Sequence, residues 1–230
     1  MVYSRILFLV LILVASSLQG QEVQFGLSGN PLISWMKSES GKVDKGKVRA
    51  GIEYGLAVDV IFKKNYILST GITADLCGGN LIYNDSLPVP TASGDSLIYG
   101  ANARFKLQYV NIPVIFKMRT NEIGRFRYYG GLGLVPAFRV KSNMDLTEGG
   151  TTYYDNANIR KVKDDTNGLL VSNIFNLSMH VEAGLEYPFS DNTALRAGVF
   201  YRNGFLNVIS DNNDDSIVLN YFAIAIGVLF

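Results

Sequence analysis

The stretch "NLSMHVEAGLEY", residues 176–187, decides the fold class because its apolar and polar side chains alternate. A β-strand sends successive side chains to opposite faces, whereas a helix would scatter both sets around its circumference. One face would carry Leu177, Met179, Val181, Ala183, Leu185 and Tyr187, and the other Ser178, His180, Glu182 and Glu186. The stretch therefore predicts a strand with one apolar face and one ionisable face.

The same period of two recurs in eight segments of about eleven to fourteen residues each. These segments are 22–35, 49–62, 66–76, 105–118, 125–138, 176–189, 193–205 and 218–230. Strands of soluble proteins usually have about five or six residues, whereas a strand that crosses an outer membrane needs about nine to eleven. The lengths favour strands that cross a membrane.

The two faces differ in residue size as well as polarity. The apolar face is large and branched, as in Ile52, Leu56, Val60 and then Ile224 and Ile226. The polar face is rich in small residues: Gly51, Gly55, Ala57, Gly71, Gly131, Gly133, Gly184, Gly198, Ala223, Ala225 and Gly227. Small residues suit a narrow barrel interior, whereas a water-facing exterior has no need of them. We therefore expect the apolar face to contact lipid and the polar face to line the lumen.

The connections between the segments alternate in length. Long linkers at 36–48, 77–104, 139–175 and 206–217 alternate with short ones at 63–65, 119–124 and 190–192. Outer-membrane barrels have short periplasmic turns and longer extracellular loops. The sequence predicts an all-β fold, an eight-stranded antiparallel up-and-down transmembrane β-barrel with four extracellular loops and both termini in the periplasm.

The first twenty residues have the layout of a secretory signal peptide. Arg5 precedes the apolar run "ILFLVLILVA" (6–15), and the small and polar stretch "SSLQGQ" (16–21) follows it. The run of about ten residues is too short for a transmembrane helix. We expect residues 1–20 to be cleaved after Gly20 and residues 21–230 to form the outer-membrane barrel domain.

Composition excludes several classes of function. A net charge of +1 over 230 residues gives no electrostatic reason to expect nucleic acid as a partner. The chain has one cysteine, Cys77, and one histidine, His180, so no clustered His/Cys metal signature is present in the sequence. We expect no cofactor, no metal and no enzyme activity, with outer-membrane lipid as a partner and a monomeric barrel.

The inward-facing positions collect charges of both signs. The interior of an eight-stranded barrel is only just wide enough for side chains to fill, and an isolated buried charge is costly. We therefore expect a closed polar network in the lumen and not a pore. The predicted members are the acids Glu53, Asp59, Asp75, Glu182 and Glu186, the bases Lys117, Arg127, Arg139, Arg196 and Arg202, and His180.

Ser178, His180 and Glu182 are the three residue types of a hydrolase triad, but they lie on one strand. Positions i and i+2 of a strand are about 6.5–7 Å apart, beyond the roughly 2.6–3.2 Å of a catalytic hydrogen bond. We therefore expect a structural role for these residues. The alternatives to a non-enzymatic barrel are an outer-membrane lipid-modifying hydrolase and a soluble periplasmic lipid-binding β-barrel.

Pro113 lies within the fourth predicted strand. Proline lacks the backbone N–H that a strand donates to its neighbour, and within sheets it usually marks a bulge or an edge. We expect a local irregularity of the fourth strand at this residue.

Three short motifs carry a family resemblance. "YVNIPVIFKM" (109–118), "YYGGLGLVPAF" (128–138) and the aromatic-ended "AIGVLF" (225–230) resemble the PorT-like outer-membrane β-barrel family of Bacteroidetes, a barrel of the eight-stranded OmpA-like type. The resemblance implies an outer-membrane location in a diderm bacterium. Some members are tied to type IX secretion and gliding, and most have no assigned activity. We expect a non-enzymatic barrel whose extracellular loops serve adhesion, envelope structure or a secretion assembly.

Overall fold

The computed structural model describes residues 22–38, 43–84, 87–91, 94–159, 170–190, 192–211 and 216–230. The predicted signal peptide, residues 1–20, lies outside these ranges. The regular secondary structure of the described residues consists of antiparallel β-strands. Within the same ranges no helix is long and apolar enough to span a membrane.

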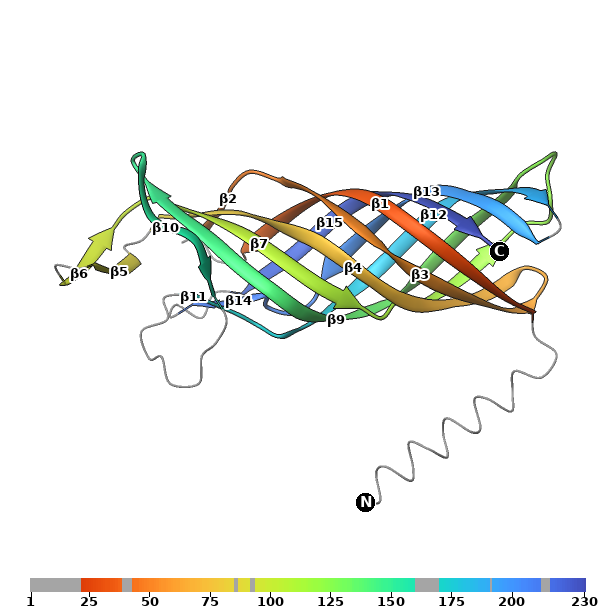
Figure 1. Cartoon of the computed structure of the whole chain (residues 1–230), viewed down its shortest axis with the longest axis horizontal. Helices are drawn as coiled ribbons and strands as arrows, with labels where there is room; N and C mark the ends of the chain where they lie inside the picture. Colours follow the sequence, from red (N-terminus) through yellow and green to blue (C-terminus); the bar gives the residue numbers. More distant parts are fainter. Residues whose placement is uncertain are drawn as a thin grey trace, which may run out of the picture.

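The strands close into a barrel (Figure 1). Each wall strand pairs with its neighbour along the chain, and the last pairs with the first. In order, the wall strands are β1 (Glu22–Ser38), β3 (Arg49–Lys63), β4 (Tyr66–Tyr83), β7 (Ala101–Asn111) with β8 (Val114–Arg119), β9 (Arg127–Glu148), β12 (Phe175–Ser190), β13 (Thr193–Gly204) and β15 (Ile217–Leu229). Because β7 and β8 share one place, the described wall has eight positions, which confirms the predicted barrel class.

The fourth wall position is interrupted at Pro113, as predicted. β7 ends at Asn111 and β8 begins at Val114, and both pair with β4 on one side and β9 on the other. The Ile112 N–H still donates to the Pro136 carbonyl oxygen at 2.9 Å, so the wall stays connected across the break. Proline therefore divides the strand without opening the barrel.

The two ends of the barrel differ. At one end, which we term the turn end, tight connections join β3 to β4, β8 to β9 and β12 to β13. The first described residues and Phe230 lie there too, since Phe25 and Phe230 exchange backbone hydrogen bonds of 2.9 and 2.8 Å. The opposite end, which we term the long end, carries the longer connections (Figure 1).

Much of the long end is paired strand, where the sequence predicted loops. β4 continues to Tyr83, β7 begins at Ala101 and β9 continues to Glu148. We term residues 77–83, 101–108 and 141–148 the strand extension; of these, residues 105–108 lie within the predicted strand 105–118. Further strands accompany it: β2 (Val43–Lys45) on β4, β10 (Thr151–Asn158) on β9, β5 (Leu87–Thr91) with β6 (Gly94–Ile98), and β11 (Leu170–Ser172) with β14 (Ile209–Asp211).

The prediction of a loop was wrong at 77–83 because glycine there permits close approach and does not mark a turn. A Cβ on Gly78 would lie 2.1 Å from the Phe105 carbonyl oxygen, and its φ of +144° suits glycine. Glycine within a strand often marks a place where another backbone comes near. Gly78 and its neighbours therefore let β4 pair with β7 beyond the predicted strand end.

The apolar face of the wall points outward. Ile224 and Ile226 are 50% and 53% exposed, whereas Glu182 and Arg196, on the inward face, are each 8% exposed. On β3 the outward apolar row runs from Ile52 to Phe62. At about 3.3 Å per residue and a tilt of about 40°, this row is about 25 Å tall, the height of a lipid-facing band. A soluble lipid-binding barrel would have the opposite arrangement and is excluded.

Both faces reverse their character along the fourth wall position. Towards the turn end the residues that face away from the barrel axis are apolar, from Val110 to Met118. Towards the long end they are polar: Gln108, Lys106, Arg104 and Asn102. The inward residues change from polar to apolar at the same level. The strand extension thus has the polar exterior and apolar interior of a protein in water.

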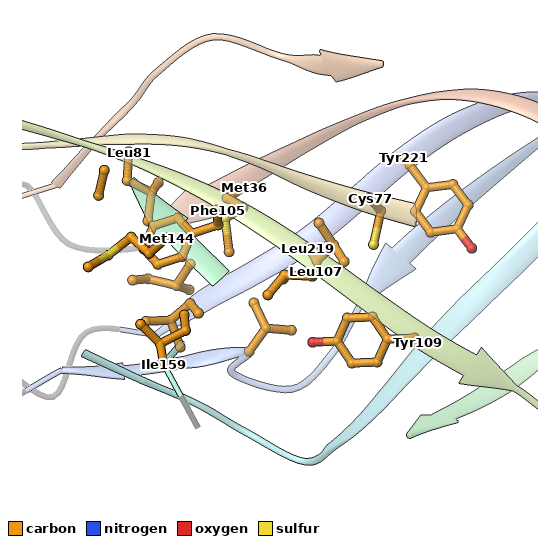
Figure 2. Close-up of a cluster of buried hydrophobic side chains, with 14 of the residues drawn as sticks. Met36, Cys77, Leu81, Phe105, Leu107, Tyr109, Met144, Ile159, Leu219 and Tyr221 are labelled. Carbon is orange, nitrogen blue, oxygen red and sulfur yellow. The ribbon is translucent and has the colours of Figure 1, made fainter. Parts of the chain in front are cut away.

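An apolar core fills the interior of the strand extension (Figure 2). We term this cluster the apolar plug. Figure 2 shows that Tyr109, Cys77 and Tyr221 lie at the side of the plug nearer the barrel centre, with Met144 and Ile159 farther out. Its largest buried members include Met36, Leu81, Tyr83, Phe105, Leu107, Leu146 and Ile209. The sequence prediction of a polar lumen therefore does not extend to the long end.

Two outward substitutions on the fourth wall position test where the lipid-facing band ends. Val114→Arg, near the middle of the band, should destabilise the barrel by about 2–4 kcal/mol. Gln108→Arg, six residues farther along the same face, should cost less than about 1 kcal/mol because its position lies outside the hydrocarbon. Urea unfolding of both variants in lipid vesicles measures the difference, and equal costs would contradict the band boundary.

Candidate functional site

The lumen nearer the turn end holds an ion-paired cluster around Arg196. Arg196 on β13 lies 2.5 Å from the Asp59 carboxylate of β3 and 2.8 Å from the Glu186 carboxylate of β12. Ser69 on β4 donates a 2.5 Å hydrogen bond to Asp59, and Arg119 lies 3.5 Å from Glu186. One buried guanidinium thus joins two carboxylates from opposite sides of the barrel, which offsets the cost of burying them.

A second ion pair lies beside this cluster. The Lys117 ammonium group is 2.8 Å from the Glu182 carboxylate, and His180 Nε2 is 3.6 Å from the other oxygen of Glu182. Lys117 and Arg196 both lie over the ring of Tyr129, at 5.7 and 5.2 Å from its centroid. Cations over an aromatic face are attracted by the ring quadrupole.

Tyr129 fits because its neighbours have no side chain. Gly184 on β12 and Gly198 on β13 are cross-strand partners, and Gly184 also pairs with Tyr129. A Cβ on Gly184 would lie 2.7 Å from the Tyr129 hydroxyl oxygen, and a Cβ on Gly198 would lie 2.8 Å from it. The small residues noted in the sequence therefore make room here for an aromatic ring that fills the lumen.

A third group of polar side chains surrounds Arg202, nearer the long end. Arg202 lies 2.5 Å from the Glu53 carboxylate, donates to the Tyr221 hydroxyl, and donates through Nε to His180 Nδ1 at 3.0 Å. The Tyr221 hydroxyl is 3.3 Å from both Glu53 and Asp75. The histidine thereby connects this group to the Glu182 pair.

Asn111 joins the two carboxylates of this group. Its side-chain amide donates to Asp75 at 3.0 Å and to Glu53 at 3.4 Å. The Tyr109 backbone N–H adds a 3.2 Å bond to Asp75. The residue directly before the Pro113 break therefore satisfies both buried acids.

Nine of the eleven residues predicted for the lumen network are buried on the inward face. Arg127 is not among them: its side chain is one-third exposed at the turn end, 3.7 Å from Glu122. Arg139 is half-buried, beyond the lumen groups, and donates to the Ser172 carbonyl oxygen. Arg127 is the first residue of β9, whereas Arg139 lies within β9 opposite Tyr109, at the level of the plug and not of the buried charges.

Sequence reasoning missed Arg119, Asn111, Tyr129 and Tyr221 as members of the lumen groups. Arg119 was assigned to a turn, although β8 includes it. The two tyrosines face inward by the same parity that identified Glu53 and Arg196, so the sequence was sufficient to place them in the lumen. Their hydroxyl and ring contacts depend on the pairing register across strands, which the sequence does not display.

The lumen leaves little free space. A cavity of about 80 Å³ lies between the Arg196 and Arg202 groups, lined among others by Glu53, His180 and Phe200. This volume corresponds to about two or three water molecules. The apolar plug begins on the long-end side of the Arg202 group, since Tyr221 belongs to both. Side chains of the described residues therefore occupy the barrel on both sides of this cavity, from the ion pairs to the plug.

The three residues of triad type do not form a triad. The Ser178 hydroxyl donates to the Val135 carbonyl oxygen at 3.4 Å, and His180 accepts from Arg202. Both side chains are buried. The described residues also contain no group of three or more His, Cys, Asp or Glu side chains arranged to hold a metal ion.

Residues 6–230 match the family described as the outer membrane protein beta-barrel domain. The chain belongs to this family. Membership places it in the outer membrane and agrees with the outward apolar band. The match does not separate PorT-like members from others, and no curated protein matches the chain.

Solved structures with similar folds are outer-membrane barrels of low sequence identity. Neisserial surface protein A shares 14% identity over 89% of this chain and 95% of its own, with a TM-score of 0.47. OprG from Pseudomonas aeruginosa shares 11% over 91% and 97%, with a TM-score of 0.46. The outer membrane protease OmpT from Escherichia coli shares 9% over 92% and 96%, with a TM-score of 0.45. At these scores none of them bears on the function of this chain.

Two arginine substitutions compare the stability contributed by the buried lumen cluster with that contributed by an exposed ion pair at the turn end. Arg196→Met should destabilise the barrel by about 3–5 kcal/mol, because it leaves Asp59 and Glu186 buried without their main partner. Arg127→Met removes an equal charge from a partly exposed pair and should cost less than about 1 kcal/mol. The free energies of unfolding in detergent micelles measure both, and similar values for the two variants would refute the assignment.

Proposed function

We propose that this protein is a non-enzymatic outer-membrane barrel with a closed lumen that holds the strand extension outside the cell as a binding platform. The observation that carries the proposal is the reversal of both faces along the fourth wall position, with the apolar plug inside the extension. A barrel that conducts solutes has a polar, water-filled path, whereas a plug with a polar exterior suits a projecting structural element.

The turn end faces the periplasm in this proposal, so that both chain ends lie there. Outer-membrane barrels keep their short turns on the periplasmic side and their longer connections outside. The tight β3–β4 and β12–β13 connections support this orientation, as does the length of β9, which continues well beyond the apolar band at the other end. The strand extension then projects from the cell.

Closure of the lumen rests on two successive barriers. The first is the set of ion pairs around Arg196 and Arg202, whose groups contact one another across the barrel. Moving these charges apart would leave buried groups unpaired, at a cost of several kcal/mol. The second is the apolar plug, whose buried apolar side chains are poor partners for an ion. Together they support a scaffold and not a channel.

The strand extension suits recognition because its shape is fixed. Its strands are paired along their length and its interior is packed, so the surfaces that it presents need little ordering when a partner binds. Flexible loops of similar size would lose conformational entropy on binding. The extension therefore supports a role in adhesion, in envelope structure or in a secretion assembly.

The finer assignments follow the sequence resemblance. Some PorT-like proteins are tied to type IX secretion, and in such an assembly this protein would have envelope proteins as partners of the extension and lipid around the wall. The paired ladder of the whole described wall supports a monomeric barrel. The buried placement of Ser178 and His180 supports the absence of hydrolase activity.

Conductance measurements test the closed lumen. The purified protein, reconstituted in planar bilayers, should show no steady open current under an applied voltage, because the ion pairs and the plug fill the path. A general porin prepared in the same lipid serves as the positive control. A reproducible unitary conductance that scales with protein concentration would overturn the proposal of a closed scaffold.

Replacement of the β5–β6 hairpin tests the platform. A variant in which a short Gly-Ser linker replaces residues 87–97 should keep its urea unfolding midpoint, because the described hairpin strands pair with each other and the buried Ile98 of the plug is retained. Affinity purification from native outer membranes should then show loss of envelope partners that the wild-type protein retains. Unchanged partner recovery by this folded variant would contradict the hairpin as the binding element of the platform.

A further inference from the structure

A polar groove crosses the outer surface of the wall just beyond the apolar band at the long end. It has a volume of about 180 Å³, roughly the space of six water molecules, and is lined by residues of β3, β4, β7, β9 and β10. Its charged lining side chains are Arg49, Lys106 and Lys141, and its other polar lining side chains are amides, including Gln108 and Asn143. We term it the basic groove, since no carboxylate is among the described residues that line it.

The basic groove lies at the level where lipid headgroups begin. Its apolar lining includes Leu76, which is 37% exposed and is the last outward apolar residue of β4 before the extension. On the neighbouring β7 the outward residue changes from Val110 to Gln108, and Gln108 pairs with Lys141 of β9. The groove therefore has hydrocarbon-facing surface at one edge and positive charge at the other.

Two of the three cations in the groove are available to a ligand. The Lys106 ammonium group is engaged, because it lies 2.8 Å from Asp145. Arg49 and Lys141 have no carboxylate within 4.0 Å among the described residues. The Arg49 Nε atom is buried and has no hydrogen-bond partner within the same part of the chain. A buried donor without a partner is costly, so an acceptor here would stabilise the site.

The backbone positions Arg49 over the groove. The described ladder between β3 and β4 ends at the Ile52–Leu76 pair, so Arg49 lies beyond this ladder and pairs only with Ser34 of β1. Its Cδ atom lies 3.2 Å from the place that a Cβ on Gly78 would occupy, so the side chain passes closely over this glycine. Gly78 pairs with Lys106 on β7. Arg49 is thereby brought from β3 towards the cations of β7 and β9.

We propose that the basic groove binds the phosphate of a membrane lipid in the leaflet at the long end. A guanidinium and an ammonium group that lack carboxylate partners match the oxygens of a phosphate group. The acyl chains of the same lipid would lie along the apolar residues directly beneath, Leu76, Val110 and Phe138. Both parts of a phospholipid thus find complementary surface, whereas a free phosphate ion would use the cations alone.

The experiment measures lipid binding to the full chain by native mass spectrometry in an uncharged detergent. The probes are dioleoyl phosphatidylglycerol, dioleoylglycerol, which has the same chains without the phosphate, and inorganic phosphate. Phosphatidylglycerol should bind at least tenfold more tightly than either of the other two. Equal binding of dioleoylglycerol would show that the phosphate is not recognised, and equal binding of inorganic phosphate would show a free-anion site; either result overturns the proposal.

Matched variants assign the binding to the groove. Arg49→Gln with Lys141→Gln should weaken phosphatidylglycerol binding roughly tenfold to thirtyfold, from about 1 kcal/mol per cation. Lys37→Gln with Lys47→Gln removes two exposed charges from the same end but outside the groove, and should change binding less than twofold. Equal losses in both pairs would contradict a specific site.

A further variant covers the case in which the loss of Arg49 disturbs folding. Lys141 is exposed, so Lys141→Gln alone leaves the wall intact and should still weaken phosphatidylglycerol binding several-fold. Unchanged binding by this folded variant would overturn the proposal. The outcome is independent of the channel and partner experiments, because it concerns the outer wall and neither the lumen nor the hairpin.

Discussion

The pairing of β1 with β15 is the constraint on which the structure depends, because it leaves the wall without an edge. In hydrocarbon an unpaired backbone N–H or C=O group costs several kcal/mol, so a sheet that crosses a membrane must close on itself. Closure at eight positions fixes a narrow interior, and a narrow interior must be filled. Outward apolar rows, inward glycines and buried charges are all consequences of this geometry.

The interior combines two solutions to the same packing problem. Within the lipid-facing band, paired charges and the Tyr129 ring over Gly184 and Gly198 fill the space. Beyond the band, the same strands enclose the apolar plug and present polar side chains outside. Water surrounds the extension, so the usual rule of an apolar inside returns as soon as the strand leaves the lipid. One continuous strand thus obeys opposite patterns in two media.

The sequence predicted the barrel because a period of two assigns every residue of a strand to a face. It also predicted the break at Pro113, since proline removes a backbone donor. It did not predict most of the strand extension, because Gly78, Gly79 and Asn80 read as turn residues and the connections 77–104 and 139–175 were therefore predicted to be loops. Arg127 and Arg139 shared the parity of Arg196 but not its depth, which the strand tilt and register decide.

Closure between the two ends of the chain also determines the order in which the barrel can form. β1 is synthesised well before β15, one of its two partners, because most of the described strands lie between them in the sequence. Contacts between residues so distant in sequence form slowly, because most of the chain must be ordered before they are reached. Until then, two open strand edges with exposed apolar rows invite aggregation. Export of this chain therefore requires that it stay unfolded in transit. The barrel can close only once β15 is available to pair with β1.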